Sequence, residues 1–294
     1  PAPFPVELVE RLLKLYSYEG SLVLDPFNGI GTTSVASQQN GRRFIGIDQS
    51  KLYTDLSKKR LNEDETIRMT YDMNYSNLVN PKSSEGTLNE YFPYKESYSP
   101  QLLKNLIERY SIENYNSIYD PFVGTGSTFT NDLVSDVFGT DVSPFALNVS
   151  QAKILPLSTS SIREAAKLTE SLADLEIYHQ QFPEWKPFSK YVCQEKYNIV
   201  KSVIDYYKGL EGEVSNFISY LIYSNLDKIF DYKRDGNGIK FRKSKIQKED
   251  LLEFLRKLIL SALESKGEFD KTNRIDSAMF ILSSSTNFVI GVLS

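Results

Sequence analysis

The sequence predicts an α/β protein in which two similar halves, each built from strands and helices, precede a mainly helical region. Three observations support this fold class. A glycine-rich turn, DPFNGIGTT at residues 25–33, returns as DPFVGTGST at residues 120–128. Each turn follows a short apolar run typical of a strand and begins a run typical of a helix. After residue 158 the chain continues in helical patterns without a further turn of this kind.

The first half alternates strands and helices up to residue 62. A proline begins its first helix, and Gly41 ends the second in the position that favours a left-handed cap. Such an alternation implies parallel strands joined by right-handed crossovers. The predicted elements are a helix at 5–16, a strand at 21–25, a helix at 31–39, a strand at 42–48 and a helix at 51–62.

The second half repeats the first after a polar stretch that predicts a linker. Pro5 precedes Asp25 by 20 residues, and Pro100 precedes Asp120 by the same 20, so an internal repeat is indicated. The predicted elements are a helix from 99 or 100, a strand at 117–120, a helix after the second turn, a strand at 137–141 and a helix from 143 or 144 to about 153.

The last part predicts helices at 160–177, 191–208, 213–230 and 248–266, with a basic loop at 231–245 between the last two. Its tail, residues 278–294, is typical of the first strands of a further sheet. We therefore expect four segments: a first cofactor-binding part at 1–63, a linker at 64–90, a second cofactor-binding part at 91–157, and a helical region at 158–294.

Composition limits the class of protein. The 294 residues are 40% apolar and 24% charged, which is ordinary for a globular protein. One cysteine, Cys193, excludes a disulfide framework or a cysteine-rich zinc site, and no apolar run reaches the ~20 residues of a membrane span. We expect a cytoplasmic protein without a metal. The net charge of −4 argues weakly against a wholly basic surface but leaves room for a local basic groove.

The turns have the chemistry of a nucleoside site. Neither ends in the GK[ST] of a phosphate-binding loop, and neither is a GxGxxG fingerprint. Each instead has an acid before its glycines, Asp25 or Asp120, and a second acid closing the next strand, Asp48 or Asp141. The second acid suits ribose hydroxyls and the first suits a cationic group. The four aspartates together suit a nucleoside with a cationic amino-acid tail, and S-adenosylmethionine is such a molecule. A single such turn is often only a tight connection, but two copies favour the cofactor.

These residues resemble the amino-methyltransferases of DNA, which modify adenine at N6 or cytosine at N4, in their circularly permuted, beta-class-like arrangement. PAPFPVELVERL, DPFNGIGTT and GRRFIGID resemble the cofactor half of that family. YFPYKESYSPQLLKNLIERY, DPFVGTGST and FGTDVSPFAL resemble it a second time, so the likeness covers about residues 1–62 and 91–155. Ile30 and Thr125 replace the usual serine between the glycines, which we expect to alter affinity rather than abolish binding. The resemblance implies a Rossmann-like, S-adenosylmethionine-dependent fold in two copies.

The resemblance also implies roles for individual residues. Asp25 and Asp120 would hold the methionine end of the cofactor, Asp48 and Asp141 its ribose, and the segments near Phe4 and near Tyr94 its carboxylate. The full set implied for the cofactor is Phe4, Pro5, Asp25, Pro26, Phe27, Asn28, Gly29, Gly31, Thr32, Thr33, Asp48, Tyr94, Lys95, Ser97, Asp120, Pro121, Phe122, Gly124, Gly126, Ser127, Thr128, Asp141 and Val142.

The catalytic motif of that family, an acid, asparagine or serine before Pro-Pro-aromatic, is absent: the chain has no Pro-Pro pair. Ser143-Pro144-Phe145 follows the ribose acid and is interpreted as a helix start. We therefore name no catalytic residue and expect a fragment from the junction of two fused units, inactive alone, whose base chemistry lies beyond both ends. The two units could pair within one chain and methylate the two strands of an asymmetric site.

The basic segment is a candidate DNA contact. Its basic residues stand against one acid, Asp235, with Tyr232 and Phe241 interleaved. Such a run is often only a solvated loop, but beside a DNA-modifying fold it suits phosphates. His179 and Trp185 favour structural roles. Two alternatives remain open: an interaction or nucleic-acid-binding module whose cofactor sites have decayed, and an RNA methyltransferase. The residues predicted to bind DNA are Lys233, Arg234, Lys240, Arg242, Lys243 and Lys245.

Overall fold

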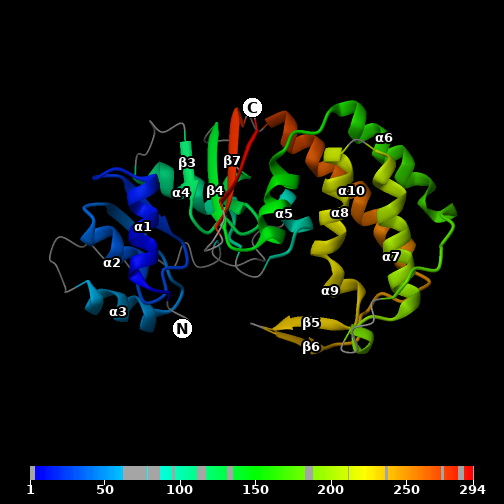
Figure 1. The fold of residues 1–294 in the computed structure, drawn as a ribbon, viewed down its shortest axis with the longest axis horizontal. Coiled ribbons are helices and arrows are strands. Elements are labelled where there is room, and N and C mark those ends of the chain that lie inside the picture. The colour runs from blue at the N-terminus through cyan, green and yellow to red at the C-terminus, as the bar shows by residue number, and fades with distance from the viewer. Residues whose placement is uncertain are drawn as a thin grey trace. The chain divides into compact units, whose positions relative to one another are not determined.

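The computed structural model divides into two compact units (Figure 1). Unit 1 comprises Pro1–Ser83 and Ser97–Glu113, and unit 2 comprises Ser84–Glu96 and Asn114–Ser294. The residues that the structure describes are 4–61, 78, 87–94, 97–110, 117–130, 135–182, 188–210, 212–235, 238–272, 275–283 and 288–293.

Unit 1 is a two-stranded parallel sheet with helices around it (Figure 1). The two strands pair in parallel, Leu22 opposite Arg43 and Asp25 opposite Gly46, as the strand–helix–strand alternation predicts. The elements are α1 (Val6–Tyr16), β1 (Leu22–Asp25), α2 (Thr32–Gln39), β2 (Arg43–Gly46), α3 (Lys51–Arg60) and α4 (Pro100–Tyr110).

Both faces of the unit 1 sheet are covered. Val23 of β1 packs with α1 and α2, against Val9, Leu13 and Ala36. The next residue, Leu24, packs with Leu102 and Leu106 of α4, because successive strand residues point to opposite faces. The repeat placed α4 with the second half of the chain, whereas its buried leucines lie on the first sheet. The predicted domain boundaries otherwise stay a prediction.

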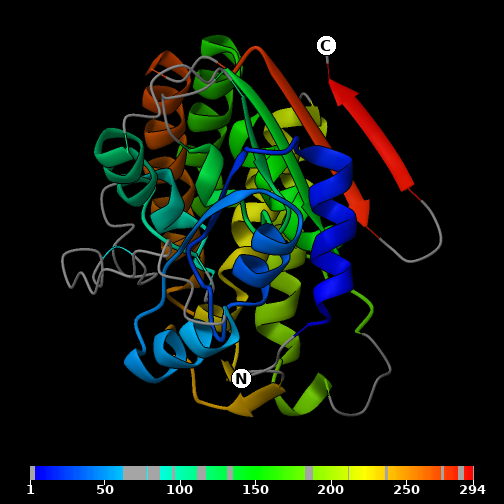
Figure 2. The same ribbon diagram turned by 90° about the vertical axis from the view of Figure 1, so that its left-hand side faces the viewer.

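Unit 2 contains a four-stranded sheet in the order β3-β4-β7-β8. Its strands are β3 (Ser117–Asp120), β4 (Asp136–Asp141), β7 (Ser277–Ser283) and β8 (Phe288–Leu293). The first three are parallel, and β8 runs antiparallel along β7, as Figure 2 shows for the two red strands near the C-terminus. The tail predicted to begin a further sheet thus contributes two strands to the sheet that carries the second turn.

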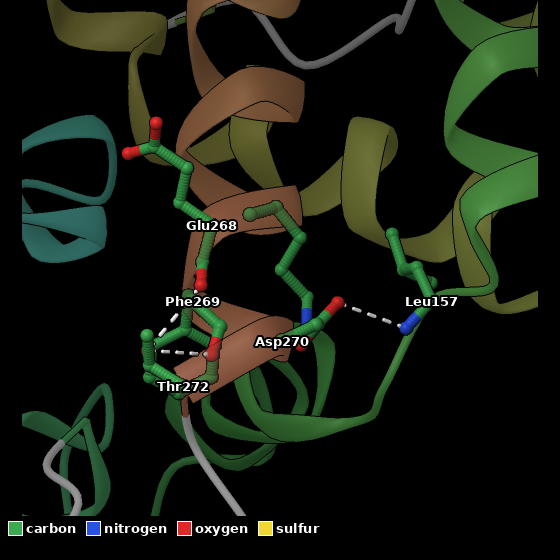
Figure 3. A network of polar contacts seen from close by, with 6 residues as sticks. Leu157, Glu268, Phe269, Asp270 and Thr272 are labelled. Carbon is green, nitrogen blue, oxygen red and sulfur yellow. Dashed lines mark hydrogen bonds and ion pairs between the residues drawn. The ribbon is translucent and has the colours of Figure 1, made fainter.

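A long helical core follows. Its helices are α5 (Pro144–Ile154), α6 (Thr159–Glu170), α7 (Gln194–Tyr206), α8 (Gly212–Ser224), α9 (Leu226–Ile229) and α10 (Leu251–Thr272), with short 3-10 helices at Ser171–Asp174, Phe188–Lys190 and Tyr207–Gly209. Leucine, isoleucine, valine and aromatic side chains from these helices form one buried cluster. Figure 3 shows a hydrogen bond that links α10 to the segment between α5 and α6. The Asp270 carboxylate on α10 accepts it from the backbone N–H of Leu157 at 3.0 Å.

Two segments of unit 2 form short 3-10 helices that the sequence pattern did not predict. The helix expected after the second turn is a 3-10 helix, η4 (Ser127–Phe129), in the described residues. It turns Phe129 into the core, where the ring lies 5.8 Å from that of Phe280. The end of the predicted linker is η3 (Leu88–Tyr91), whose Leu88 is buried in the helical core.

The basic loop is instead a β-hairpin. Strand β5 (Tyr232–Asp235) pairs antiparallel with β6 (Gly238–Phe241). Just after β6, the Ser244 hydroxyl donates a hydrogen bond of 2.6 Å to the Lys228 carbonyl and so holds the hairpin against the residues before it. Figures 1 and 2 both show the hairpin at the end of the helical part, reached from α8 through α9. No helix in the described residues has the length and apolar character needed to cross a membrane.

Candidate functional site

The first glycine-rich turn is built by backbone geometry that only glycine adopts easily. It leaves β1 at Asp25 and enters α2 through Gly29 and Gly31, whose φ angles are +53° and +81°. The Asp25 carboxylate accepts the N–H of Phe27 at 3.0 Å, which fixes the start of the turn. The turn thus connects the end of β1 to the start of α2 at Thr32.

The second aspartate of each pair holds the turn together. Asp48 accepts the N–H of Gly29 at 2.9 Å on one oxygen and that of Ser50 at 2.7 Å on the other. In unit 2, Asp141 accepts the N–H of Gly124 at 2.9 Å and that of Ser143 at 2.8 Å. The two predicted ribose acids thus occupy the same hydrogen-bonded position in both copies.

Asp25, the first aspartate of the first copy, is less stable as an anion than an aspartate in water. Burial raises the pKa of Asp25, and nearby Asp48 adds to this rise. The Thr33 hydroxyl and the Phe27 amide lower the pKa in part, without cancelling the effect of burial. A carboxylate that is poorly solvated and under-compensated gains free energy when a cation approaches. A role of Asp25 in holding the cationic end of a cofactor stays a prediction.

The second glycine of each turn is dictated by helix packing. A Cβ on Gly31 would lie 2.1 Å from Oγ of Ser57 on α3, and one on Gly126 would lie 2.9 Å from Oγ of Ser150 on α5. Neither serine was predicted. The signal was available, since Ser57 and Ser150 each follow the ribose acid of their copy by nine residues.

The two turns differ in what covers the first glycine. A Cβ on Gly29 would meet no atom nearer than 3.8 Å, whereas one on Gly124 would lie 3.0 Å from the ring of Tyr94. Tyr94 therefore lies over the second turn, in the segment predicted to approach the cofactor. The Thr128 hydroxyl also donates a hydrogen bond to Asp120. Thr33 forms the corresponding hydrogen bond to Asp25 in the first turn. The two turns therefore differ in the aromatic ring that lies over the first glycine.

Asn28 has no polar counterpart in the second copy, where Val123 takes its place. Its amide donates to Ser57 Oγ at 3.2 Å and accepts from Ser34 Oγ at 2.7 Å. These contacts turn the side chain into the interior of the turn. A direct cofactor contact by this side chain stays a prediction.

The other predicted residues fall into groups. Phe27 and Phe122 are exposed aromatic side chains beside the turns, and Val142, directly after Asp141, is 77% exposed. Phe4 packs on the core below α1, and Pro5 caps that helix. The Arg60 guanidinium donates a hydrogen bond of 3.1 Å to the Thr32 hydroxyl. Pro26, Pro121 and Ser127 lie within the turns, Ser97 is buried in unit 1, and Lys95 lies outside the described residues.

The predicted DNA contacts lie on the hairpin and just after it. Lys233 and Lys240 stand directly opposite each other across β5 and β6, both exposed. Arg242, Lys243 and Lys245 follow β6 and are exposed too, and Arg234 lies on β5 opposite Ile239. The register thus brings two basic side chains to neighbouring positions on the hairpin.

Comparisons with known proteins decide the family. The family model of D12 class N6 adenine-specific DNA methyltransferases matches residues 95–277, more than half of the chain. The chain belongs to this family. A second model, described as DNA methylase, matches residues 1–59 of this D12 class chain. The two matches each contain one glycine-rich turn, and the resemblance to adenine or cytosine amino-methyltransferases of DNA is confirmed.

Curated relatives of this D12 class chain are similar over short stretches. The type II methyltransferase M2.DpnII of Streptococcus pneumoniae is 48% identical over 67 residues, covering 22% of this chain and 25% of the relative. The type II methyltransferase M.MthZI of Methanothermobacter thermautotrophicus is 45% identical over 72 residues, covering 24% and 20%. The chain therefore spans about a quarter of the length of the curated relatives it matches.

One solved structure is also similar in sequence. It is a DNA modification methylase of Thermus thermophilus, 46% identical, covering 21% of this chain and 27% of that one, with a TM-score of 0.21. In the described residues, no group of three or more His, Cys, Asp or Glu side chains is arranged to hold a metal ion.

Proposed function

We propose that this chain serves methyl transfer from S-adenosylmethionine to the exocyclic N6 amine of adenine in DNA, as part of a restriction-modification enzyme. The repeated pair of aspartates around each glycine-rich turn carries the proposal. Membership of an adenine-specific family supports N6 of adenine as the acceptor over N4 of cytosine. The type II methyltransferases among the relatives support the restriction-modification setting.

The residues of both turns fit the cofactor. Asp48 and Asp141 each accept one backbone N–H on each oxygen. A carboxylate has about four lone-pair positions, so each keeps acceptor capacity for two ribose hydroxyls. Asp25 and Asp120 would hold the cationic methionine end, and the exposed Phe27, Phe122 and Val142 would contact its apolar parts. When bound, S-adenosylmethionine supplies the electrophilic methyl group.

We also propose that the two turns belong to two Rossmann-like methyltransferase units. In each, a parallel β-strand pair ends at an aspartate that opens a glycine turn. In each, an aspartate at the end of the next strand or two residues after it accepts hydrogen bonds from two backbone amides. The same bonds recur at corresponding positions, which supports duplication of one functional unit.

The hairpin supplies the contact to DNA. Lys233 and Lys240, both exposed on the hairpin, would each bind a phosphate. The reacting amine has its lone pair delocalised into the adenine ring, so the enzyme must extrude the base and hydrogen-bond the amine during attack. The chain lacks a Pro-Pro-aromatic motif for that step, so binding rather than turnover is the property to measure.

Isothermal titration of the 294-residue chain with S-adenosylmethionine tests the cofactor part. We expect binding to be lost when Asp25→Ala and Asp120→Ala are combined, while each single variant keeps the other turn. The matched control combines Asp55→Ala and Asp174→Ala, which remove exposed acids from the same two units. Binding unaffected by the first pair would contradict the proposal, and DNA binding without cofactor binding would favour a decayed module.

Salt dependence of binding tests the DNA part. Removing one phosphate contact lowers the slope of log K against log[salt] by about 0.9 on duplex DNA. Lys233→Gln and Lys240→Gln should each reduce the slope by about that amount and weaken binding to all sequences alike. Lys271→Gln, an exposed lysine at the end of α10, is the control. An unchanged slope in both hairpin variants would remove the hairpin from the interface.

A further inference from the structure

An aromatic hollow lies on unit 2, lined by residues other than those whose hydrogen bonds build the second turn. Its lining comes from Phe145 and Asn148 of α5, Tyr220 and Tyr223 of α8, and Leu226 of α9, around a volume of about 550 Å³. Helices α5 and α8 pack side by side (Figure 1). We call these five residues the aromatic hollow.

The rings of the aromatic hollow are arranged edge to face. Those of Phe145 and Tyr220 lie 6.1 Å apart at 58°, and those of Tyr220 and Tyr223 lie 5.9 Å apart at 74°. Rings so tilted do not stack face on face with one another. Tyr223 is 36% exposed, and a flat heterocycle stacks well on exposed ring faces.

One polar group stands among these rings. Asn148 forms a hydrogen bond to the Tyr220 hydroxyl, which counteracts part of the rise that burial causes in the pKa of Tyr220. A side-chain amide has two N–H donors and a carbonyl acceptor. The remaining donor and acceptor of Asn148 match the mixed donor and acceptor edge of a nucleobase.

Positive charge borders the aromatic hollow at the end nearest the hairpin. Leu226 begins α9, which leads into β5. Arg242, which follows β6, donates a hydrogen bond of 3.4 Å to the carbonyl of Asp227, the residue after Leu226. On the other side, the Lys208 ammonium also lies near Tyr223, but an ion pair of 2.5 Å with the Asp205 carboxylate compensates its charge. Ring faces beside a cation suit an occupant that is flat and also anionic.

We propose that the aromatic hollow stacks an unpaired base of the DNA strand whose phosphates lie on the β5–β6 hairpin. This rests on the proposed DNA-modifying function and adds a second contact class to it. A nucleotide combines an aromatic base with a phosphate, which matches rings beside Arg242. S-adenosylmethionine carries positive charge at its sulfonium and ammonium groups, so the basic border disfavours it as the occupant.

Two oligonucleotide strands of equal length and charge test the proposal on the full chain, one with all bases and one with abasic positions. Stacking on one aromatic side chain strengthens binding by about 5- to 150-fold per base. We expect the wild-type chain to prefer the intact strand by a factor in this range. Tyr223→Leu should abolish most of this preference, and Tyr223→Phe should keep it.

Matched variants separate the aromatic hollow from the hairpin. Tyr178→Leu removes an exposed tyrosine outside the hollow and should leave the preference unchanged. Lys233→Gln should weaken both strands by the same factor. Far-ultraviolet circular dichroism checks the fold of each variant, and Tyr220→Leu provides an independent test if Tyr223→Leu unfolds.

Several results would overturn the proposal. Equal binding of both strands by the wild-type chain, or no binding of either, would do so, as would a preference that survives both leucine variants. Loss of the preference on addition of S-adenosylmethionine would assign the hollow to the adenine of the cofactor. Failure of the proposed function is distinguishable, because it appears as absent cofactor binding or as hairpin variants that leave DNA affinity unchanged.

Discussion

Gly31 lies so close to Ser57 that a Cβ on the glycine would be 2.1 Å from the serine Oγ, although 26 residues separate the two in the chain. Gly126 and Ser150 repeat the contact in unit 2 at 2.9 Å. The second glycine of the turn is therefore required by the approach of the next helix. The first glycine, Gly29, is required by its positive φ alone, because a Cβ there would make only an ordinary contact of 3.8 Å with the Phe27 carbonyl oxygen.

This contrast predicts different costs for two substitutions in one turn. Gly29→Ala should lower the free energy of unfolding by about 1–2 kcal/mol, the cost of a left-handed conformation for a residue with a Cβ. Gly31→Ala should cost about 1–3 kcal/mol more, because Ser57 and its helix must also move. Urea unfolding of both variants measures the difference. Equal losses would show that backbone conformation alone selects Gly31.

Asp25 should lower the stability of the cofactor-free chain at neutral pH while strengthening cofactor binding. Its raised pKa means that the native state holds this proton more tightly than the unfolded state. The stabilisation from this group is therefore present below the ordinary pKa of 3.8 and lost as pH rises through the higher native value. Asp25→Asn removes the buried charge but keeps an acceptor for the Phe27 amide.

We expect Asp25→Asn to raise the Tm of the cofactor-free chain at neutral pH and to weaken cofactor binding at the first turn. Loss of one charge-assisted contact corresponds to about a 10- to 100-fold lower affinity. Thermal melts from about pH 4 to 8, paired with titrations, measure both effects. Asp55→Asn, an exposed acid of the same unit, is the control. A lower Tm together with unchanged affinity would contradict this prediction.

The sequence predicted the local elements better than their partners. The turns, the four aspartates and the parallel strand pairs followed from short-range patterns, because glycine positions and alternating apolar runs act locally. The placement of α4 on Leu24 and Ile45 did not follow, since an amphipathic helix specifies an apolar face but not which sheet covers it. The hairpin was missed because its lysines hide the period-2 pattern of Tyr232, Ile239 and Phe241.

Contacts over long sequence separations were also out of reach. Tyr94 lies over Gly124, and the segment containing Asn89, predicted to end a linker, binds a lysine 64 residues away. Nothing in the local sequence of either segment encodes its partner. Ser57 and Ser150 were different: their equal spacing from Asp48 and Asp141 repeats in the chain, so comparing the two copies residue by residue would have identified them.

Lys153 should make the stability of unit 2 depend on pH in the alkaline range. Burial lowers its pKa from 10.5 to about 7, and its Nζ lies 2.6 Å from Oδ1 of Asn89. Between these two pKa values the unfolded chain binds a proton that the native state releases, so the stability should rise with pH from about 7 to about 10.5. The slope approaches about 1.4 kcal/mol per pH unit.

Lys153→Met fills a similar volume without the ionisable group and should remove that slope. The free energy of unfolding at about pH 7.5 and 9.5, from urea titrations of both proteins, provides the measurement. The exposed Lys271→Met variant should retain the wild-type slope. Parallel pH dependences for wild type and Lys153→Met would show that Lys153 stays charged in the folded chain.

Lys266 and Asp270 form an ion pair one turn apart on α10, and Asp270 also binds the backbone of Leu157 (Figure 3). The lysine side chain is fully buried and the aspartate is 11% exposed. Burial lowers the pKa of Lys266 and raises that of Asp270, while each charge opposes the shift of the other. Removing one partner therefore leaves an uncompensated charge in the core.

Asp270→Asn should lower the free energy of unfolding by about 3–5 kcal/mol, because it keeps an acceptor for Leu157 but strands the Lys266 ammonium. Lys266→Met combined with Asp270→Asn should recover most of that loss, since no buried charge remains. Chemical denaturation of the single and double variants closes the cycle. If the double variant lost the sum of both single effects, the pair would act as two independent contacts, and the fastening of α10 to Leu157 would not depend on the ion pair.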